Sequence, residues 1–201
     1  MKRYVKDIVG EEYKEWMCGD RILISTPTGS GKTTFVIETL LRYAMQQEKH
    51  VVYFCNRRVL HEQIEVQSEK KIRSIFTEEG DFSAEEALGH FHPYTYQNRE
   101  ACMPHAGTGV KIPISEDPET EKEIELNRDD ILYYIFDEAH YFLADATLNS
   151  ETNKWLDLFS PYSPSQNLSA GICVFLTATP ELLYRFLNAN KFLDAMRQDS
   201  L

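Results

Sequence analysis

Residues 25–34 have the sequence STPTGSGKTT, and they follow directly on an apolar run at residues 22–24. Beyond this loop, from residue 32 to residue 47, apolar side chains recur near helical spacing. A short buried strand at residues 21–25, a glycine-rich loop and a helix are therefore predicted in this order. The succession is typical of an α/β fold, and it places two glycines, a lysine and several hydroxyls where a strand passes into a helix.

The rest of the chain continues the alternation of strands and helices. Residues 103–128 carry prolines, glycines and the acidic run SEDPETEKEIE, and we interpret them as a solvated loop or hairpin. The other predicted elements are strands at 51–55, 131–136 and 172–176, a strand at 90–96 that Pro93 interrupts, a helix at 60–75 and a last helix that opens at Pro180. Strands buried on both faces and alternating with helices imply an α/β fold of three layers (αβα), with a mostly parallel central sheet.

The composition fits one domain. With 201 residues, 42% of them hydrophobic, the chain can bury one good core, and we expect residues 1–201 to form a single domain. The formal net charge of −11 is unfavourable for a protein that coats nucleic acid through its overall field, but it is compatible with a local basic cleft. Much of the excess acid lies at residues 78–86 and 116–125, so the rest of the surface is closer to balance.

The cysteines and the N-terminal stretch indicate the cellular compartment. Cys18, Cys55, Cys102 and Cys173 are scattered without a C-x-x-C pair, which favours buried, reduced thiols over a zinc ribbon or a disulfide framework. The N-terminal stretch lacks the apolar region of a signal peptide, and no apolar run approaches the roughly 20 residues that cross a bilayer. We therefore expect a soluble cytoplasmic protein without a membrane partner. The histidines other than His140 lack metal-ligand spacing, and we assign them no role.

The loop after the first strand has the physical form of a phosphate-binding P-loop. Glycines let backbone N–H groups converge on a phosphate, Lys32 supplies a positive charge, the Thr33 hydroxyl is a ligand for Mg²⁺, and the helix adds its dipole. The strict pattern has glycine where this chain has Thr26. A chance glycine turn is the alternative, and the placement between strand and helix disfavours it. The predicted nucleotide-binding residues are Thr28, Gly29, Ser30, Gly31, Lys32, Thr33 and Thr34.

An acidic pair at the end of another apolar strand supplies what phosphate hydrolysis still lacks. Asp137 and Glu138 begin the sequence DEAH directly after residues 131–136. Such an aspartate can hold Mg²⁺ through its water shell, and the adjacent glutamate can orient and deprotonate an attacking water. Alone, the pair would be typical of a solvated turn. Downstream of a P-loop, the catalytic interpretation is favoured.

Three motifs in this order resemble a known family. TPTGSGKT, then DEAH, then TAT at residues 177–179 are similar to the first RecA-like domain of a superfamily 2 helicase of the DEAD/DEAH-box type, a P-loop NTPase. The resemblance spans residues 22–179. Helicases of this type commonly have alanine or glycine at the position of Thr26, and this small change leaves the phosphate contacts intact.

The resemblance implies roles for the residues that match its motifs. ATP and Mg²⁺ would be the cofactors, with the metal held by Thr33 and Asp137. His140 would couple the nucleotide site to a partner domain, and the TAT motif would link hydrolysis to movement on nucleic acid. The implied catalytic residues are Lys32, Asp137, Glu138 and His140, and the coupling residues are Thr177, Ala178 and Thr179.

Two shorter matches concern contacts with nucleic acid. The first follows the second strand and matches motif Ia, and the second follows the third strand near motif Ib or Ic. Their residues are Asn56, Arg57 and Arg58, and Thr95, Tyr96 and Gln97. Solvated charges at a helix start and a capping turn are the respective alternatives. The glutamine that reads adenine upstream of the P-loop is missing here. Tyr13 or Trp16 either stacks on a base or belongs to the core, so adenine preference is implied by the resemblance alone.

A helicase of this type needs a second RecA-like domain, which supplies an arginine finger and the other wall of the nucleic-acid groove. A two-domain motor would need about twice this length, so we expect a fragment of a longer protein or a subunit that a partner chain completes. Two other functions stay open. One is a duplex-DNA translocase subunit of a restriction or remodelling enzyme, and the other is a nucleotide-dependent switch or binding module without nucleic-acid activity.

Overall fold

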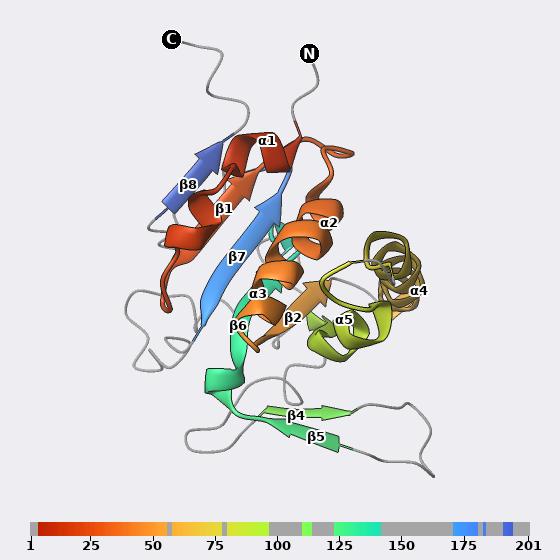
Figure 1. The fold of residues 1–201 in the computed structure, drawn as a ribbon. Helices are drawn as coiled ribbons and strands as arrows, with labels where there is room; N and C mark the ends of the chain where they lie inside the picture. Colours follow the sequence, from red (N-terminus) through yellow and green to blue (C-terminus); the bar gives the residue numbers. More distant parts are fainter. Residues whose placement is uncertain are drawn as a thin grey trace.

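The computed structural model describes residues 4–55, 58–77, 80–96, 110–113, 123–141, 171–180, 183 and 191–194. Six of the described strands form one sheet in the order β3-β2-β6-β7-β1-β8, and every neighbouring pair is parallel. The strands are β1 Arg21–Ser25, β2 His50–Cys55, β3 Phe91–Thr95, β6 Ile131–Phe136, β7 Ile172–Thr177 and β8 Lys191–Asp194. The predicted parallel sheet is confirmed, and Figure 1 shows β1, β7 and β8 pointing toward the same end of the molecule.

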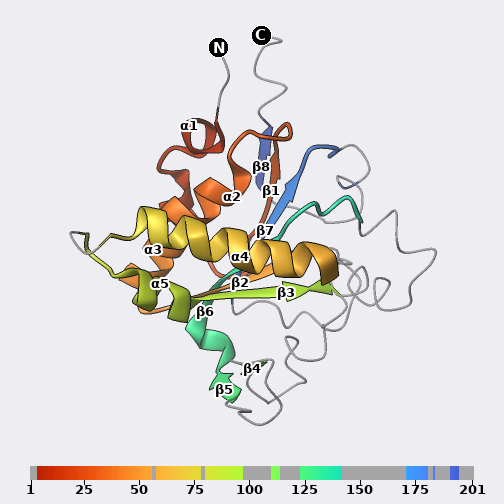
Figure 2. The same cartoon turned by 90° about the vertical axis from the view of Figure 1, so that its right-hand side faces the viewer.

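The described helices pack beside this sheet. The helix predicted at residues 32–47 is confirmed as one continuous segment whose middle turns are π-helical. Figure 1 shows its halves in front of β6 and β7, and Figure 2 shows α4 and α5 beside β3. The helical segments are α1 Val5–Val9, η1 Glu12–Glu15, α2 Lys32–Phe35, η2 Val36–Leu41, α3 Arg42–Gln46, α4 Arg58–Ile75, α5 Ala84–His90 and η4 Arg128–Asp130. The predicted helix after Pro180 falls almost entirely outside the described residues.

Pro93 does not interrupt its strand, contrary to the prediction. The strand β3 is continuous because it lies at the edge of the sheet and pairs only with β2 among the described strands. A proline lacks the N–H that a residue of a central strand donates to one of its two neighbours, but an edge strand tolerates proline where the nitrogen faces its unpaired side. In the region predicted as a loop or hairpin, β4 Val110–Pro113 and β5 Glu123–Leu126 form a separate antiparallel pair, which supports the hairpin.

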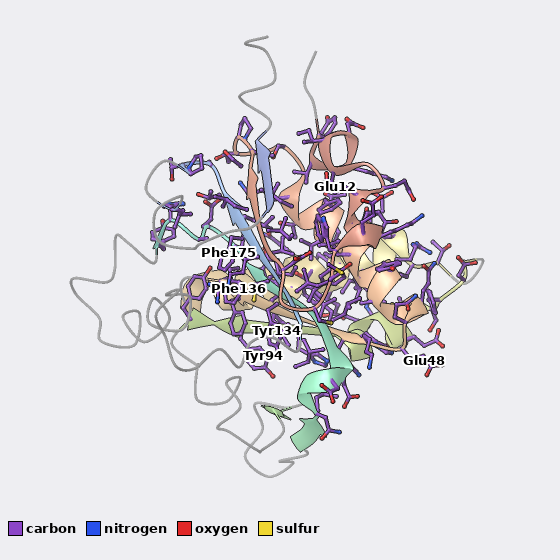
Figure 3. The ribbon with its side chains drawn as sticks, turned by 90° about the vertical axis from the view of Figure 1, so that its left-hand side faces the viewer. Glu12, Glu48, Tyr94, Tyr134, Phe136 and Phe175 are labelled. Atoms are coloured by element: carbon purple, nitrogen blue, oxygen red, sulfur yellow. The ribbon has the colours of Figure 1, made fainter. Side chains whose placement is uncertain are left out.

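Both faces of the sheet are buried. On one face, alternate strand residues pack against the α2–α3 helix in the main hydrophobic cluster. On the other face, aromatic rings stand in a row across four strands: the ring centroids of Phe54 and Phe136 are 5.1 Å apart, and those of Phe136 and Phe175 are 4.9 Å apart. Tyr94 continues the row on β3, 6.2 Å from Phe54 (Figure 3). This burial explains why the strands read as unbroken apolar runs.

One of the cysteines expected to be buried is exposed. Cys55 and Cys173 are buried, reduced thiols, as predicted, and burial raises the pKa of Cys173 to about 12. Cys18 is exposed, because it lies in the turn before β1 and not in an apolar strand. Cys102 lies outside the described residues. Among the helices that the structure describes, none has the length and hydrophobicity to cross a bilayer.

Three histidines from separate segments meet at the amino edge of the sheet. His50 Nδ1 lies 3.0 Å from His92 Nε2, and the His50 ring stacks on His90 with centroids 4.4 Å apart. Burial lowers the pKa of His92 to about 3 and also lowers the pKa of His50. The nearby charges are Asp130, which raises the His50 pKa, and Lys49, which lowers it. Both rings of the His50–His92 pair are therefore neutral at neutral pH.

We expect the protein to lose stability in mild acid through His92. In the unfolded chain His92 takes up a proton near pH 6.5, but in the native state it does so only near pH 3. The contribution of neutral His92 to stability is therefore fully present above pH 6.5 and is lost as the pH falls toward 3. For His92 alone, the free energy of unfolding should drop by about 2 kcal/mol between pH 7.5 and pH 5. Thermal or denaturant unfolding across this range, in the native chain and in His92→Gln, measures the slope. An equal slope in both proteins would contradict the assignment.

Candidate nucleotide-binding site

The carboxyl ends of four strands bring the sequence motifs together. Ser25 on β1 stands in register with Thr177 on β7, and Phe54 on β2 stands in register with Phe136 on β6. Backbone hydrogen bonds then join the segments beyond the strands: Thr26 N–H donates to Thr177 O at 3.0 Å, and Asp137 N–H donates to Phe54 O at 2.9 Å. The motifs GSGKT, DEAH and TAT therefore lie at one edge of the sheet, where α/β proteins bind ligands.

The glycine loop has the conformation that a phosphate cradle requires. Gly29 and Gly31 have φ values of 75° and 83°, in the left-handed region that favours glycine. Ser30 N–H donates to Pro27 O at 3.2 Å and closes the turn, and the helix begins at Lys32. The loop thus ends on the amino terminus of a helix that runs on to Gln46, whose first N–H groups and dipole favour an anion.

Several buried polar groups at the loop suit an anionic ligand. The hydroxyls of Ser25, Thr26 and Ser30 are buried and have no hydrogen-bond partner among the described residues. Lys32 is only 8% exposed, and its ammonium lies 3.5 Å from Glu138 Oε1, which is long for an ion pair. Buried polar groups are normally paired, so unpaired hydroxyls around a buried ammonium fit a bound polyphosphate.

The carboxylate of Asp137 is held from two sides. Tyr53 Oη donates to Oδ2 at 2.6 Å, and the backbone N–H of Glu138 donates to Oδ1 at 3.0 Å. Burial raises the pKa of Asp137, and the Tyr53 hydrogen bond opposes this shift. Thr33, the other residue predicted to bind Mg²⁺, lowers the pKa of the same tyrosine, so both predicted ligands are neighbours of Tyr53. A hydroxyl and a carboxylate are donors that Mg²⁺ accepts, so this pair fits the metal.

Glu138 has a strained backbone that aims its side chain. Its φ of 51° lies in the left-handed region, which costs a non-glycine residue roughly 1–2 kcal/mol. Hydrogen bonds hold the turn: Ala139 N–H donates to Leu176 O, and Tyr141 N–H donates to Glu138 O, both at 3.0 Å. The carboxylate is one-third exposed and faces Lys32, so it is open to a water molecule.

The DEAH and TAT motifs are in direct contact. His140 Nδ1 lies 3.2 Å from Thr177 Oγ1 and 3.3 Å from Glu138 Oε2. Thr177 is fully buried, and its hydroxyl also accepts the backbone N–H of Thr179 at 3.1 Å. A chain of polar contacts therefore runs from Lys32 through Glu138 and His140 to Thr177. The loop that carries Ala178 and Thr179 follows directly, with Thr179 exposed.

The residues predicted to contact nucleic acid are only partly described. Asn56, Arg57 and Gln97 lie outside the described residues, while Arg58 opens α4 and Thr95 ends β3. Tyr96 is 4% exposed, and its hydroxyl donates to the carbonyl oxygen of Asp137 at 2.6 Å. Its side chain thus braces the DEAH turn from inside the molecule.

Of the aromatic residues upstream of the loop, Trp16 belongs to the core and Tyr4 lies at the surface. Trp16 is buried edge-on against Tyr133, with ring centroids 6.4 Å apart, and Tyr13 packs edge-on against Tyr43 at 5.3 Å. The core interpretation therefore describes Trp16. Sequence reasoning missed Tyr4, which is 51% exposed and whose ring atom Cδ1 lies 3.4 Å from the position of a Cβ on Gly31. Its only sequence signal is an aromatic residue upstream of the P-loop.

The fold and this site define a class: the chain is a three-layer αβα P-loop domain of the RecA-like type found in superfamily 2 helicases. The sequence model of the family "Type III restriction enzyme, res subunit" matches residues 6–182, so the chain belongs to that family.

Two solved structures share this fold. The crystal structure of the DUF1998 helicase MrfA bound to DNA is similar over 93% of this chain, with a TM-score of 0.55 and 16% identity. The Hef helicase domain of Pyrococcus furiosus is similar over 96%, with a TM-score of 0.50 and 17% identity. The chain spans only 26% and 40% of those two proteins. No curated protein sequence matches it.

Proposed function

We propose that the chain is the N-terminal ATPase domain of a DEAH-type, ATP-dependent helicase or translocase that moves on DNA or RNA. The observation that carries the proposal is the convergence of Lys32, Asp137 and Glu138 at one end of the sheet, in contact through His140 with Thr177. Family membership supports ATP hydrolysis in general. The buried, reduced thiols of Cys55 and Cys173 favour a reducing compartment, and we place the protein in the cytoplasm.

In the proposed reaction, the N–H groups of the glycine loop and Lys32 bind the β and γ phosphates of ATP. Thr33 and Asp137 would hold Mg²⁺, which neutralises charge on the phosphate oxygens. When Lys32 pairs with the γ-phosphate, its 3.5 Å contact with Glu138 is broken. The Glu138 carboxylate is then free to accept a proton. Glu138 then orients a water molecule, takes its proton as the oxygen attacks the γ-phosphorus, and ADP leaves.

The coupling step uses the contact between the DEAH and TAT motifs. Because His140 contacts both Glu138 and the Thr177 hydroxyl, a change in the charge around Glu138 reaches the loop that follows β7. We propose that this loop passes the change to nucleic acid and to a second RecA-like domain, in the same chain or in a partner. The second domain would add an arginine finger, worth about 10³–10⁵ in rate in nucleotide hydrolases.

Nucleic-acid stimulation tests the proposed function. We expect the 201-residue chain to bind ATP with Mg²⁺, to hydrolyse it slowly and to unwind no duplex, whereas the protein completed by its second domain should hydrolyse ATP faster when nucleic acid is added. The measurement is steady-state ATPase activity at fixed salt with single- and double-stranded DNA and RNA. A lack of stimulation by all four would favour a nucleotide switch. Stimulation by duplex DNA without strand separation would favour a translocase of the restriction type.

A further inference from the structure

Tyr53 is a buried tyrosine in the middle of a central strand. It lies on β2, its side chain is fully buried, and its ring packs 5.6 Å from that of Phe91. Phenylalanine would fill the same space in the core, so packing alone does not account for the hydroxyl. A buried hydroxyl costs free energy unless it is hydrogen-bonded, and this one donates to Asp137 of the nucleotide site.

The direction of the hydrogen bond to Asp137 is fixed by chemistry. A carboxylate only accepts, so Tyr53 Oη donates its hydrogen to Asp137 Oδ2, at 2.6 Å. Its lone pairs therefore stay available as acceptors, and Thr33, which lowers the pKa of Tyr53, is a neighbouring side chain with a hydrogen to donate.

From this geometry we infer that Tyr53 is a positioning residue, which holds the Asp137 carboxylate in the orientation that binds Mg²⁺ together with Thr33. The inference rests on the proposed function, because it takes these two residues as the metal ligands. Thr33 belongs to the helix after the P-loop and Asp137 to the turn after β6, so the two ligands come from different segments. Tyr53 reaches both from a third segment, the buried strand β2.

A neighbouring tyrosine offers a matched control. Tyr133 lies on β6, next to β2 in the sheet, and is fully buried as Tyr53 is. Its hydroxyl has no hydrogen-bond partner among the described residues. Replacing Tyr133 by phenylalanine thus removes a buried hydroxyl from the same sheet without touching Thr33 or Asp137.

The test compares Tyr53→Phe with Tyr133→Phe and the native chain by nucleotide binding. Calorimetry or a fluorescent ATP analogue gives the affinity without Mg²⁺, in EDTA, and the Mg²⁺ concentration at half-maximal enhancement of binding. Partners that orient metal ligands typically contribute 10–100-fold to metal affinity. We therefore expect Tyr53→Phe to raise the Mg²⁺ midpoint at least tenfold and to leave binding in EDTA within about twofold, while Tyr133→Phe matches the native chain in both.

The outcomes separate this inference from the proposed function. A native chain that binds no ATP with or without Mg²⁺ overturns the proposed function, and the inference with it. A native chain that binds ATP in an Mg²⁺-dependent manner, together with an unchanged midpoint in a cooperatively folded Tyr53→Phe, overturns the inference alone. If Tyr53→Phe does not fold, ¹³C NMR of the tyrosine ζ carbons in the native chain gives the answer. Mg²⁺ added to the nucleotide complex should shift the signal of the Tyr53 ζ carbon and leave that of Tyr133 unchanged. An unchanged Tyr53 signal overturns the inference.

Discussion

Glu138→Gln is expected to stop ATP turnover while leaving ATP binding intact. Glutamine has the size and shape of glutamate and can still place an oxygen toward Lys32, but it cannot accept a proton from water. Loss of a positioned general base typically costs about 10²–10⁴ in rate. We expect kcat to fall by this factor, and the affinity for ATP with Mg²⁺ to change less than threefold. Equilibrium binding and phosphate release, measured on the same preparation, give both numbers.

The chain contains a close control for this variant. Glu48 is the other described non-glycine residue with a positive φ, 55°, and it lies in the exposed turn before β2, at the opposite edge of the sheet (Figure 3). Glu48→Gln makes the same chemical change in a similar backbone conformation. Its turnover should equal that of the native chain. Full turnover in Glu138→Gln would remove Glu138 from the role of base.

The sequence predicted the parallel sheet and the positions of the motifs because both depend on local patterns. Strands buried on two faces need continuous apolar runs, and β1, β2, β6 and β7 have them. The carboxyl ends of parallel strands lie at one edge whatever the order of the strands. The convergence of Lys32, Asp137 and Thr177 could therefore be predicted without knowing which strand pairs with which.

Two short elements, α5 and β8, are not predicted by the sequence patterns, each for its own reason. Helix α5 begins with a capping box, in which Ser83 Oγ accepts from the Glu86 N–H and Glu86 Oε2 accepts from the Ser83 N–H. The acidic stretch around it was interpreted only as a source of charge. The strand β8 has four residues, Lys191–Asp194, and is too short for a pattern to stand out.

Contacts that depend on the pairing of strands could not be predicted at all. A tyrosine among valine and phenylalanine residues on β2 is typical of a core position, and its hydroxyl becomes meaningful only because β6 pairs with β2 and ends beside it at Asp137. The same holds for His50 and His92. Their separation of 42 residues carries no metal-ligand or helical spacing, and they meet because β2 pairs with β3.

Lys32→Ala should abolish tight nucleotide binding without unfolding the protein. The ammonium is 8% exposed, and the only described ion pair it forms is the 3.5 Å contact with Glu138, so the phosphates of ATP would be its strongest partner. Truncating one member of a buried charge pair costs about 3–5 kcal/mol, which corresponds to a loss of roughly 10²–10⁴-fold in affinity. Calorimetry with ATP and Mg²⁺ measures this loss.

The melting temperature of the nucleotide-free protein tests whether Lys32 stabilises the fold or serves phosphate binding. Since the one ion pair of Lys32 among the described residues is the long contact with Glu138, its removal relieves a buried charge and should leave the melting temperature equal or slightly higher. Lys49→Ala is the control, because Lys49 Nζ donates to Asp129 O at 2.6 Å at the amino edge of the sheet, away from the site. It should bind ATP as the native chain does. A large fall in the melting temperature of Lys32→Ala would show that Lys32 holds the fold together, and native affinity in that variant would exclude it from phosphate binding.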